Sequence, residues 1–459
     1  MGSRYAAALL VCLLVAGSAL GRGSPAEQTA LDRYVAAPDP SYHFQLLKAT
    51  EGQGYRTFFV ELTSQTWLTE KELDRPVWKH ALMITVPQQL RTNTGILLIG
   101  GGDSTRQPQR PEEMAVKAAL ATGAVVADLR QVPNQPLTFT DGKPRVEDGI
   151  IAYTWDKYLK TGDEKWPARL PMTKAAVRAM DTVTAFCASN EGGRLKVGKF
   201  IVAGASKRGW TTWATAAVDD RVVGIIPIVI DTLNVPMTSA HQLAAYGSFS
   251  HALKDYEDMK LDRWAGTPQN AALMRIEDPY SYRSRFTMPK LLLNATGDQY
   301  FLPDNSQFYF DDLPGPKYLR YVPNTDHSLR NSDAQETLLA FCRKLLAGEA
   351  LPRLSWTLEP DGSIRARAVD APRQVLLWQA TNPGARDFRL ETIGPKWTNS
   401  PLERAADGSC VAKVATPEKG WTAFFIEFTY ARPGEPALKL TTQVRVVPDV
   451  LPYKDKLGR

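Results

Sequence analysis

FIVAGASKRGWTTW, residues 200–213, joins an apolar run to a helical pattern through Gly204, Ala205 and Ser206. A serine flanked by small residues at such a turn is typical of a nucleophile elbow, in which a strand leads directly into a helix. Free main-chain N–H groups at the helix start then favour negative charge beside the hydroxyl. The usual Gly-x-Ser-x-Gly spacing is not met, because the second glycine is Gly209. We therefore predict that Ser206 is a nucleophile, with a purely structural turn as the alternative.

Short apolar runs alternate with helical patterns on both sides of this turn. Strands that are apolar throughout and separated by helices indicate a parallel sheet covered on both faces. The predicted fold class is therefore α/β. The runs are GILLIGGG (95–102), AVVADL (124–129), KFIVAGAS (199–206), VVGIIPIVID (222–231), KLLLNATGD (290–298) and YLRYVP (318–323).

Two stretches interrupt the alternation and a third region ends it. Residues 132–172 and 232–288 are too long for plain connections in an α/β unit, so we expect cap insertions over the carboxyl ends of the strands, where ligands bind. From about residue 351 to 459, alternating β segments divided by Asp-Gly and Pro-Gly turns predict a C-terminal all-β, sandwich-like domain. The α/β domain is predicted to span 22–350.

Residues 1–21 have the pattern of a secretory signal peptide, with a short basic start, an apolar core and a small-residue exit. A buried apolar helix is the alternative. No later stretch offers the ~20 uninterrupted apolar residues of a membrane helix. We expect an exported protein, periplasmic or extracellular, without a stable membrane span.

Composition limits the class of partner. The excess of six positive charges comes from 55 basic and 49 acidic residues spread along the chain without runs, which does not predict a nucleic-acid partner. Of four cysteines, Cys12 leaves with the signal peptide, and the rest predict neither a disulfide scaffold nor a metal site. Neither phosphate-binding glycine motif is present, so no cofactor is predicted. The expected partner is a small-molecule or peptide substrate.

A base and an acid for Ser206 have few candidates. His327, one of five histidines, follows the predicted strand 318–323 and precedes a helical pattern, as the chain order serine, acid, histidine requires. The alternative is a surface or structural histidine. Asp298 ends an earlier strand, from which a carboxylate can hold the imidazole Nδ1. Asp231, at the end of the strand before that, is the alternative acid.

An oxyanion hole needs main-chain donors aimed at the developing charge. The N–H of Lys207, directly after the nucleophile, is one candidate, and the loop Gly101, Gly102, Asp103 after the 95–99 run is the other. Glycines there permit close approach of the backbone to a substrate.

Basic side chains beside the serine are a further candidate feature. Lys207 and Arg208 would suit an anionic group on the substrate, or would pair with cap acids such as Asp156 or Asp163, and the sequence leaves both readings open. Other candidates for substrate contact are Trp155 and His241.

Seven motifs spread along the chain carry a resemblance to a known family. They are TWLTEKELDRPVWKHALMITVP (66–87), LLIGGGDS (97–104), GIIAYTWDKYLKTGDEKWPARLPMTKAAVRAMD (149–181), GASKRGWTTW (204–213), IPIVIDTLN (226–234), LNATGDQYFLPD (293–304) and NTDHSL (324–329). Together they resemble the PhoPQ-activated pathogenicity-related family. The resemblance implies an α/β-hydrolase core with a serine-type site, in which Ser206, Asp298 and His327 take the triad roles.

The elbow is also similar to that of glucuronoyl esterases, whose serine is likewise followed by a basic residue and then by a glycine three places on. We therefore predict an exported serine hydrolase that cleaves an ester or amide bond through an acyl-enzyme at Ser206. A uronate-ester esterase is one alternative. The other is a non-catalytic binding or signalling protein on a hydrolase scaffold.

Overall fold

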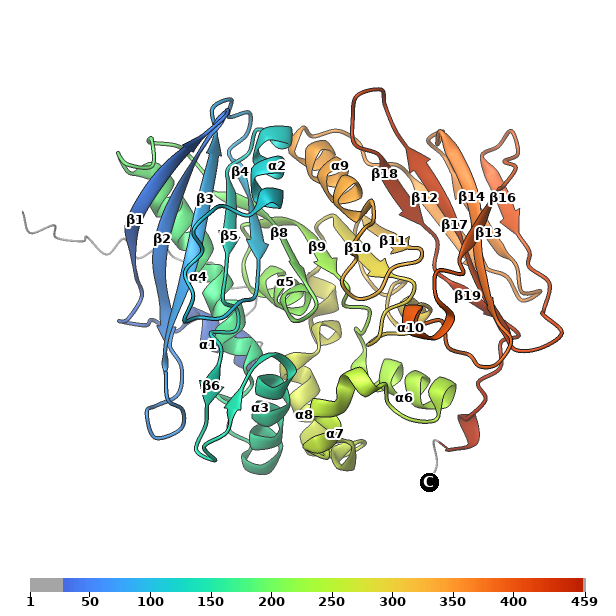
Figure 1. The fold of residues 1–459 in the computed structure, drawn as a ribbon, viewed down its shortest axis with the longest axis horizontal. Helices are drawn as coiled ribbons and strands as arrows, with labels where there is room; N and C mark the ends of the chain where they lie inside the picture. Colours follow the sequence, from blue (N-terminus) through green and yellow to red (C-terminus); the bar gives the residue numbers. More distant parts are fainter. Residues whose placement is uncertain (1–27, 457–459) are drawn as a thin grey trace, which may run out of the picture.

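The computed structural model describes residues 28–456, so the predicted signal peptide, 1–21, lies outside the described residues. One mixed sheet runs through the molecule (Figure 1), in the order β1-β2-β3-β5-β4-β8-β9-β10-β11-β18-β17-β14-β15. Strands β5, β4, β8, β9, β10 and β11 are parallel to one another. The bounds are β1 (His43–Gly52), β2 (Tyr55–Thr66), β3 (Val77–Pro87), β4 (Thr94–Ile99), β5 (Val126–Leu129), β8 (Lys199–Ala205), β9 (Val222–Ile228), β10 (Lys290–Ala295) and β11 (Lys317–Val322).

Helices cover both faces of the parallel strands. Successive side chains of a strand point to opposite faces, and in β8 Phe200 and Val202 enter the core with α4 and α5, whereas Ile201 enters the core with α2 and α9. This arrangement confirms the predicted α/β class and explains why the strands are apolar throughout. The helices are α1 (Ala30–Ala36), α2 (Glu113–Thr122), α4 (Arg169–Ala188), α5 (Lys207–Val218) and α9 (Ala334–Leu346).

The two stretches expected to form a cap contain helices that gather at the carboxyl ends of the parallel strands (Figure 1). The first stretch, 132–172, carries α3, and the second, 232–288, carries α6, α7 and α8. Helix α3 packs against α7 and α8, so the two stretches contact each other. The bounds are β6 (Leu137–Thr138), β7 (Pro144–Arg145), α3 (Glu147–Thr161), α6 (Val235–Tyr246), η2 (His251–Leu253), α7 (Lys254–Asp258), η3 (Leu261–Trp264), α8 (Pro268–Glu277) and η4 (Pro279–Arg285).

The C-terminal region is rich in strands, as predicted, but it is not detached from the α/β sheet. Strand β18 pairs with β11, so one layer of the sandwich continues the central sheet. A second sheet, β12-β13-β16, packs on that layer through a shared apolar core that includes Ile364 and Phe424. The bounds are β12 (Leu354–Leu358), β13 (Ile364–Ala368), β14 (Gln374–Asn382), α10 (Leu390–Ile393), β15 (Thr398–Pro401), β16 (Ser409–Ala412), β17 (Trp421–Tyr430), β18 (Leu438–Thr441) and β19 (Arg445–Val447).

Buried charges pair across this junction. Arg320 of β11, 1% exposed, donates to Glu427 of β17 and, over 2.9 Å, to Asp333. Lys439 of β18 donates to the other oxygen of Asp333 over 2.6 Å. Because a buried charge is costly unless it is paired, these contacts fix the C-terminal strands against the α/β sheet.

Between residues 28 and 456 no helix is both long and apolar enough to cross a membrane. The cysteines in this range are free and buried, and burial raises the pKa of Cys187 and Cys342 to about 12 and that of Cys410 to about 11. At neutral pH they are protonated, small apolar groups.

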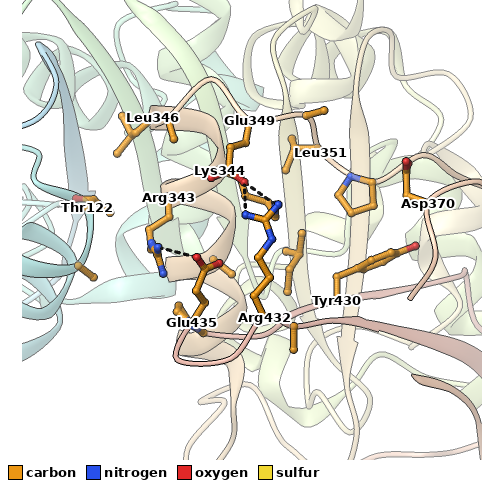
Figure 2. A pocket seen from close by; sticks show the side chains of 18 of the residues that line it. Thr122, Arg343, Lys344, Leu346, Glu349, Leu351, Asp370, Tyr430, Arg432 and Glu435 are labelled. Atoms are coloured by element: carbon orange, nitrogen blue, oxygen red, sulfur yellow. Dashed lines mark hydrogen bonds and ion pairs between the residues drawn. The ribbon is translucent and has the colours of Figure 1, made fainter. Parts of the chain in front are cut away.

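A cleft of about 820 Å³ is lined by the end of α2, by α9 and by C-terminal residues that include Tyr430 and Arg432 (Figure 2). Ion pairs join its walls, Arg343 to Glu435 over 3.3 Å and Arg432 to Glu349 over 3.2 Å. The cleft also includes Thr122, at the end of α2, and Thr92, just before β4. It therefore opens at the amino ends of the parallel strands, the edge opposite Ser206.

Candidate active site

Ser206 occupies the turn between β8 and α5 with φ 56° and ψ −123°. A positive φ is uncommon for a residue with a side chain, and such strain persists only where the surrounding structure holds it. The Ser206 N–H donates to the Ile228 carbonyl over 2.8 Å, and the Ser206 carbonyl accepts from Trp210 N–H over 3.0 Å. Strand pairing and helix thus fix the sharp turn expected from the sequence.

The unusual glycine spacing has a steric cause. A Cβ on Gly204 would lie 2.6 Å from the Arg208 carbonyl oxygen, and a Cβ on Gly209 would lie 2.9 Å from the Ile228 carbonyl oxygen. Helix α5 therefore approaches β8 at Gly204 and the end of β9 at Gly209. At position 208 the main-chain carbonyl makes the close approach to Gly204, so this position does not require a glycine and can carry an arginine side chain.

Asp298 and His327, the predicted acid and base, lie in contact with each other. His327 Nδ1 lies 2.8 Å from Asp298 Oδ2, and Asp298 Oδ1 accepts from Tyr300 N–H, also over 2.8 Å. The His327 N–H donates to Gln299 Oε1 over 3.0 Å. The Asp298 side chain is buried, whereas that of His327 remains 19% exposed. One carboxylate oxygen is thus held by the backbone, and the other orients the imidazole.

The elbow and the imidazole flank a common aromatic side chain. The Tyr300 ring centroid lies 4.5 Å from that of His327 and 6.0 Å from Lys207 Nζ. Ser206 directly follows β8, and Asp298 and His327 lie in the loops after β10 and β11. The carboxyl ends of these parallel strands share one edge of the sheet. The fold therefore brings the elbow and the Asp–His pair to the same edge.

Asp231, the alternative acid, has other partners. The hydroxyls of Tyr309 and Tyr321 donate to its two carboxylate oxygens. Burial raises the pKa of Asp231 to about 7, against the lowering effect of the two tyrosines. The carboxylate that contacts His327 is that of Asp298.

The two basic side chains after Ser206 are paired within the protein. Lys207 Nζ donates to Asp148 Oδ2 over 2.7 Å, and Arg208 makes two parallel hydrogen bonds to Glu147, of 2.7 and 2.8 Å. Burial opposes ionisation of Glu147, yet the Arg208 hydrogen bonds outweigh it and lower the Glu147 pKa to about 2. Pairing with cap acids was one of two open readings, but the acids are these and not Asp156 or Asp163.

Asp156 instead accepts from Lys160, and Asp163 accepts from the Lys165 N–H. Glu147 and Asp148 are the first two residues of α3, about two helical turns before Asp156, whereas Asp163 lies beyond the end of the helix. The start of α3 carries the acids that pair with the two cations, which sequence spacing alone did not reveal.

The glycine loop after β4 lies beside the elbow. Gly102 has φ 122°, a conformation suited to glycine. The Gly101 carbonyl accepts from Gln131 N–H over 2.9 Å, and the Asp103 carboxylate accepts from the N–H and hydroxyl of Thr105. A Cβ on Gly101 would lie 2.4 Å from Arg208 Nη2, so this loop rests against the arginine of the elbow helix.

Trp155 and His241, candidates for substrate contact, are buried in this structure. The Trp155 ring packs edge-on against Trp210 and Tyr256, with centroids 6.3 and 5.5 Å away. His241 Nε2 lies 3.0 Å from Asp304, whose other oxygen accepts from Arg386 over 2.5 Å. The two side chains are thus packed against the residues around them, Trp155 against rings and His241 against a carboxylate.

Several residues around the elbow were not anticipated. Arg169 Nη1 donates to the Lys207 carbonyl over 2.9 Å and its Nε lies 3.3 Å from Glu277, which ties both cap stretches to the elbow. Tyr256 donates to Asp148 over 3.0 Å. Tyr300 was signalled by its place two residues after Asp298, whereas Arg169 and Glu277 carried no sequence signal.

The mixed sheet, the strained elbow and the Asp–His pair define the α/β-hydrolase fold. The chain belongs to the PhoPQ-activated pathogenicity-related protein family, whose model matches residues 31–389. It is 37% identical over 456 residues to autocrine proliferation repressor protein A of Dictyostelium discoideum, covering 93% of this chain and 92% of the relative.

Solved structures that resemble the chain include two esterases. Acetyl xylan esterase 1 from Thermoanaerobacterium sp. JW/SL YS485 is 14% identical, with a TM-score of 0.45, 65% of this chain covered and 87% of that one. A glucuronoyl esterase from Solibacter usitatus is 13% identical, with a TM-score of 0.40, 68% of this chain covered and 90% of that one.

Proposed function

We propose that this protein is a serine hydrolase that cleaves an ester or amide bond through an acyl-enzyme at Ser206. The observation that carries the proposal is the 2.8 Å contact between Asp298 Oδ2 and His327 Nδ1. This contact lies at the carboxyl edge of the parallel strands, the edge at which Ser206 follows β8. A buried carboxylate on Nδ1 leaves Nε2 as the basic nitrogen, as activation of a serine hydroxyl requires.

The reaction follows from these groups. His327 Nε2 takes the proton of Ser206 while Oγ attacks the carbonyl carbon, and Asp298 stabilises the imidazolium that results. The oxyanion is received by the Lys207 N–H and by main-chain donors of the loop at Gly101 and Gly102. Lys207 is the first residue of α5, and the first N–H groups of a helix have no hydrogen-bond partner within that helix. The imidazolium then protonates the leaving group, and water activated by His327 releases the acyl group.

The paired state of the basic side chains bears on the substrate. The Arg208 guanidinium is occupied by Glu147 and by the Val132 carbonyl, and Lys207 is held by Asp148. A substrate carboxylate would have to displace acids that already hold both cations through charge-assisted hydrogen bonds. We therefore propose a neutral acyl group at this position. Export is proposed on the sequence pattern of residues 1–21 alone.

Active-site labelling with a fluorophosphonate, alongside hydrolysis of p-nitrophenyl acetate, tests the proposal. Wild type and S328A are expected to be labelled and to turn over the ester, whereas S206A does neither. Ser328 is a matched control because it is the neighbour of His327 and its hydroxyl is engaged by Asp326. Folded wild type that resists labelling would favour a binding or signalling protein on a hydrolase scaffold.

A further inference from the structure

Arg208 connects the elbow helix to the loop that follows β4. Its Nε donates to the Val132 carbonyl and its two Nη atoms form the fork with Glu147. It is 9% exposed, in a site where the guanidinium has little freedom to move. The contact with Gly101 is so close that a methyl group there would overlap Nη2, at 2.4 Å.

The segment that accepts from Arg208 also holds the glycine loop. The N–H groups of Gln131 and Val132 donate to the carbonyls of Gly101 and Gly100, over 2.9 and 3.1 Å, and Ser104 N–H donates to Gln135 over 2.8 Å. A shift of segment 131–135 would therefore move the loop with it.

Glu147, the partner of the fork, is fixed to the same segment. Its N–H donates to Gln135 Oε1 over 2.8 Å, and its carboxylate accepts from Gln135 Nε2 over 2.7 Å. Glu147 has φ 50°, a conformation that must be held by its surroundings. The arginine, the glutamate and the glycine loop are thus parts of one hydrogen-bonded unit.

We infer that Arg208 is a positioning residue that sets the distance between Ser206 and the main-chain donors at Gly101 and Gly102. The inference rests on the proposed function, since it concerns the second half of the oxyanion hole. An arginine suits this role because its planar fork holds one carboxylate and one carbonyl in fixed directions, which a lysine cannot do. Donors placed about 1 Å away from the oxyanion lose much of their effect on the transition state and little of their effect on ground-state binding.

The test compares R208K with R285K in p-nitrophenyl acetate hydrolysis and in the rate of fluorophosphonate labelling. Arg285 is a matched control, because it too forms a fork, to Asp32, and donates to a carbonyl of α5, that of Ala217, but far from the glycine loop. We expect R208K to lower kcat by about 10- to 100-fold with KM changed by less than about threefold. R285K is expected to leave kcat within about twofold at a similar loss of Tm.

A double-mutant cycle with G101A separates the loop from general destabilisation. If both residues act at the same contact, the loss of kcat in G101A/R208K is no greater than the larger single loss. Multiplied losses, or equal effects of R208K and R285K, would overturn the inference. Should R208K not fold, E147Q decides in its place, with a smaller fall in kcat at unchanged KM expected. Unlabelled, inactive wild type would instead refute the proposed function itself.

Discussion

The substitution D298N tests the orientation of the base most sharply. In the protein, Oδ1 of Asp298 accepts from Tyr300 N–H and Oδ2 faces His327 Nδ1, both over 2.8 Å. The asparagine oxygen must remain at Tyr300, because an amide NH₂ there would face another donor. The NH₂ group then faces His327 Nδ1 and forces its proton onto Nε2. With a proton on Nε2, the imidazole cannot accept the proton of Ser206.

The expected loss in kcat is about 10³- to 10⁴-fold, the size seen when an aspartate is replaced by asparagine in a comparable triad. At about 1.4 kcal/mol per factor of ten, this loss is about 4 to 5.5 kcal/mol of transition-state stabilisation. The assay is hydrolysis of p-nitrophenyl acetate at pH 7.5, with thermal unfolding as a check of folding. D231N is the control, because Asp231 is held by the hydroxyls of Tyr309 and Tyr321, and it is expected to keep kcat within about threefold. D298N with more than about a tenth of wild-type activity, or a larger loss in D231N, would refute the reasoning.

Three further predictions concern stability. The Asp231 pKa of about 7 lies above its usual 3.8, so the folded protein keeps a proton that the unfolded chain releases, and this stabilisation is lost as pH rises from about 4 to 7. The free energy of unfolding is measured by urea titration for wild type and for D231N. The wild-type value minus the D231N value should fall by about 2 kcal/mol between pH 5 and 7. A difference that does not change with pH would contradict this. R386M removes the guanidinium partner of the buried Asp304 carboxylate and should cost about 3–5 kcal/mol in urea unfolding. R353M, at an exposed fork to Asp370, should cost far less. Equal costs of the two substitutions would contradict the importance of the buried Arg386–Asp304 pair. G204A should cost about 2–3 kcal/mol or prevent folding, because the added Cβ would overlap the Arg208 carbonyl oxygen. G198A, where an added Cβ has no atom within 4 Å, should be nearly neutral in the same assay. A tolerated G204A would speak against the close approach of α5 to β8.

The parallel sheet and the elbow were predictable because they follow local rules. Residues 200–213 combine an apolar run, small residues and a helical pattern, and each of these has a direct structural cause. The pairing of Asp298 with His327 was predictable from chain order, since successive parallel strands end at one edge of the sheet. The position of the second glycine was visible, but its cause, the approach of α5 to β9, required the packed structure.

Long-range partners were beyond the sequence. The acids that hold Lys207 and Arg208 lie about sixty residues earlier, and several cap carboxylates offered equal charge. The continuity of the C-terminal strands with the α/β sheet depends on β18 beside β11, a contact between segments more than one hundred residues apart. Alternating β patterns predicted strands there but carried no information about which edge they would join.

The most direct test of the central claim, that Ser206 is the nucleophile, is to locate the fluorophosphonate adduct by mass spectrometry after trypsin digestion. Cleavage after Lys199 and Lys207 yields the peptide FIVAGASK, in which Ser206 is the one hydroxyl side chain. The adduct mass is predicted on this peptide in wild type and in the S328A control. An adduct on another peptide, or none on folded protein, would contradict the account.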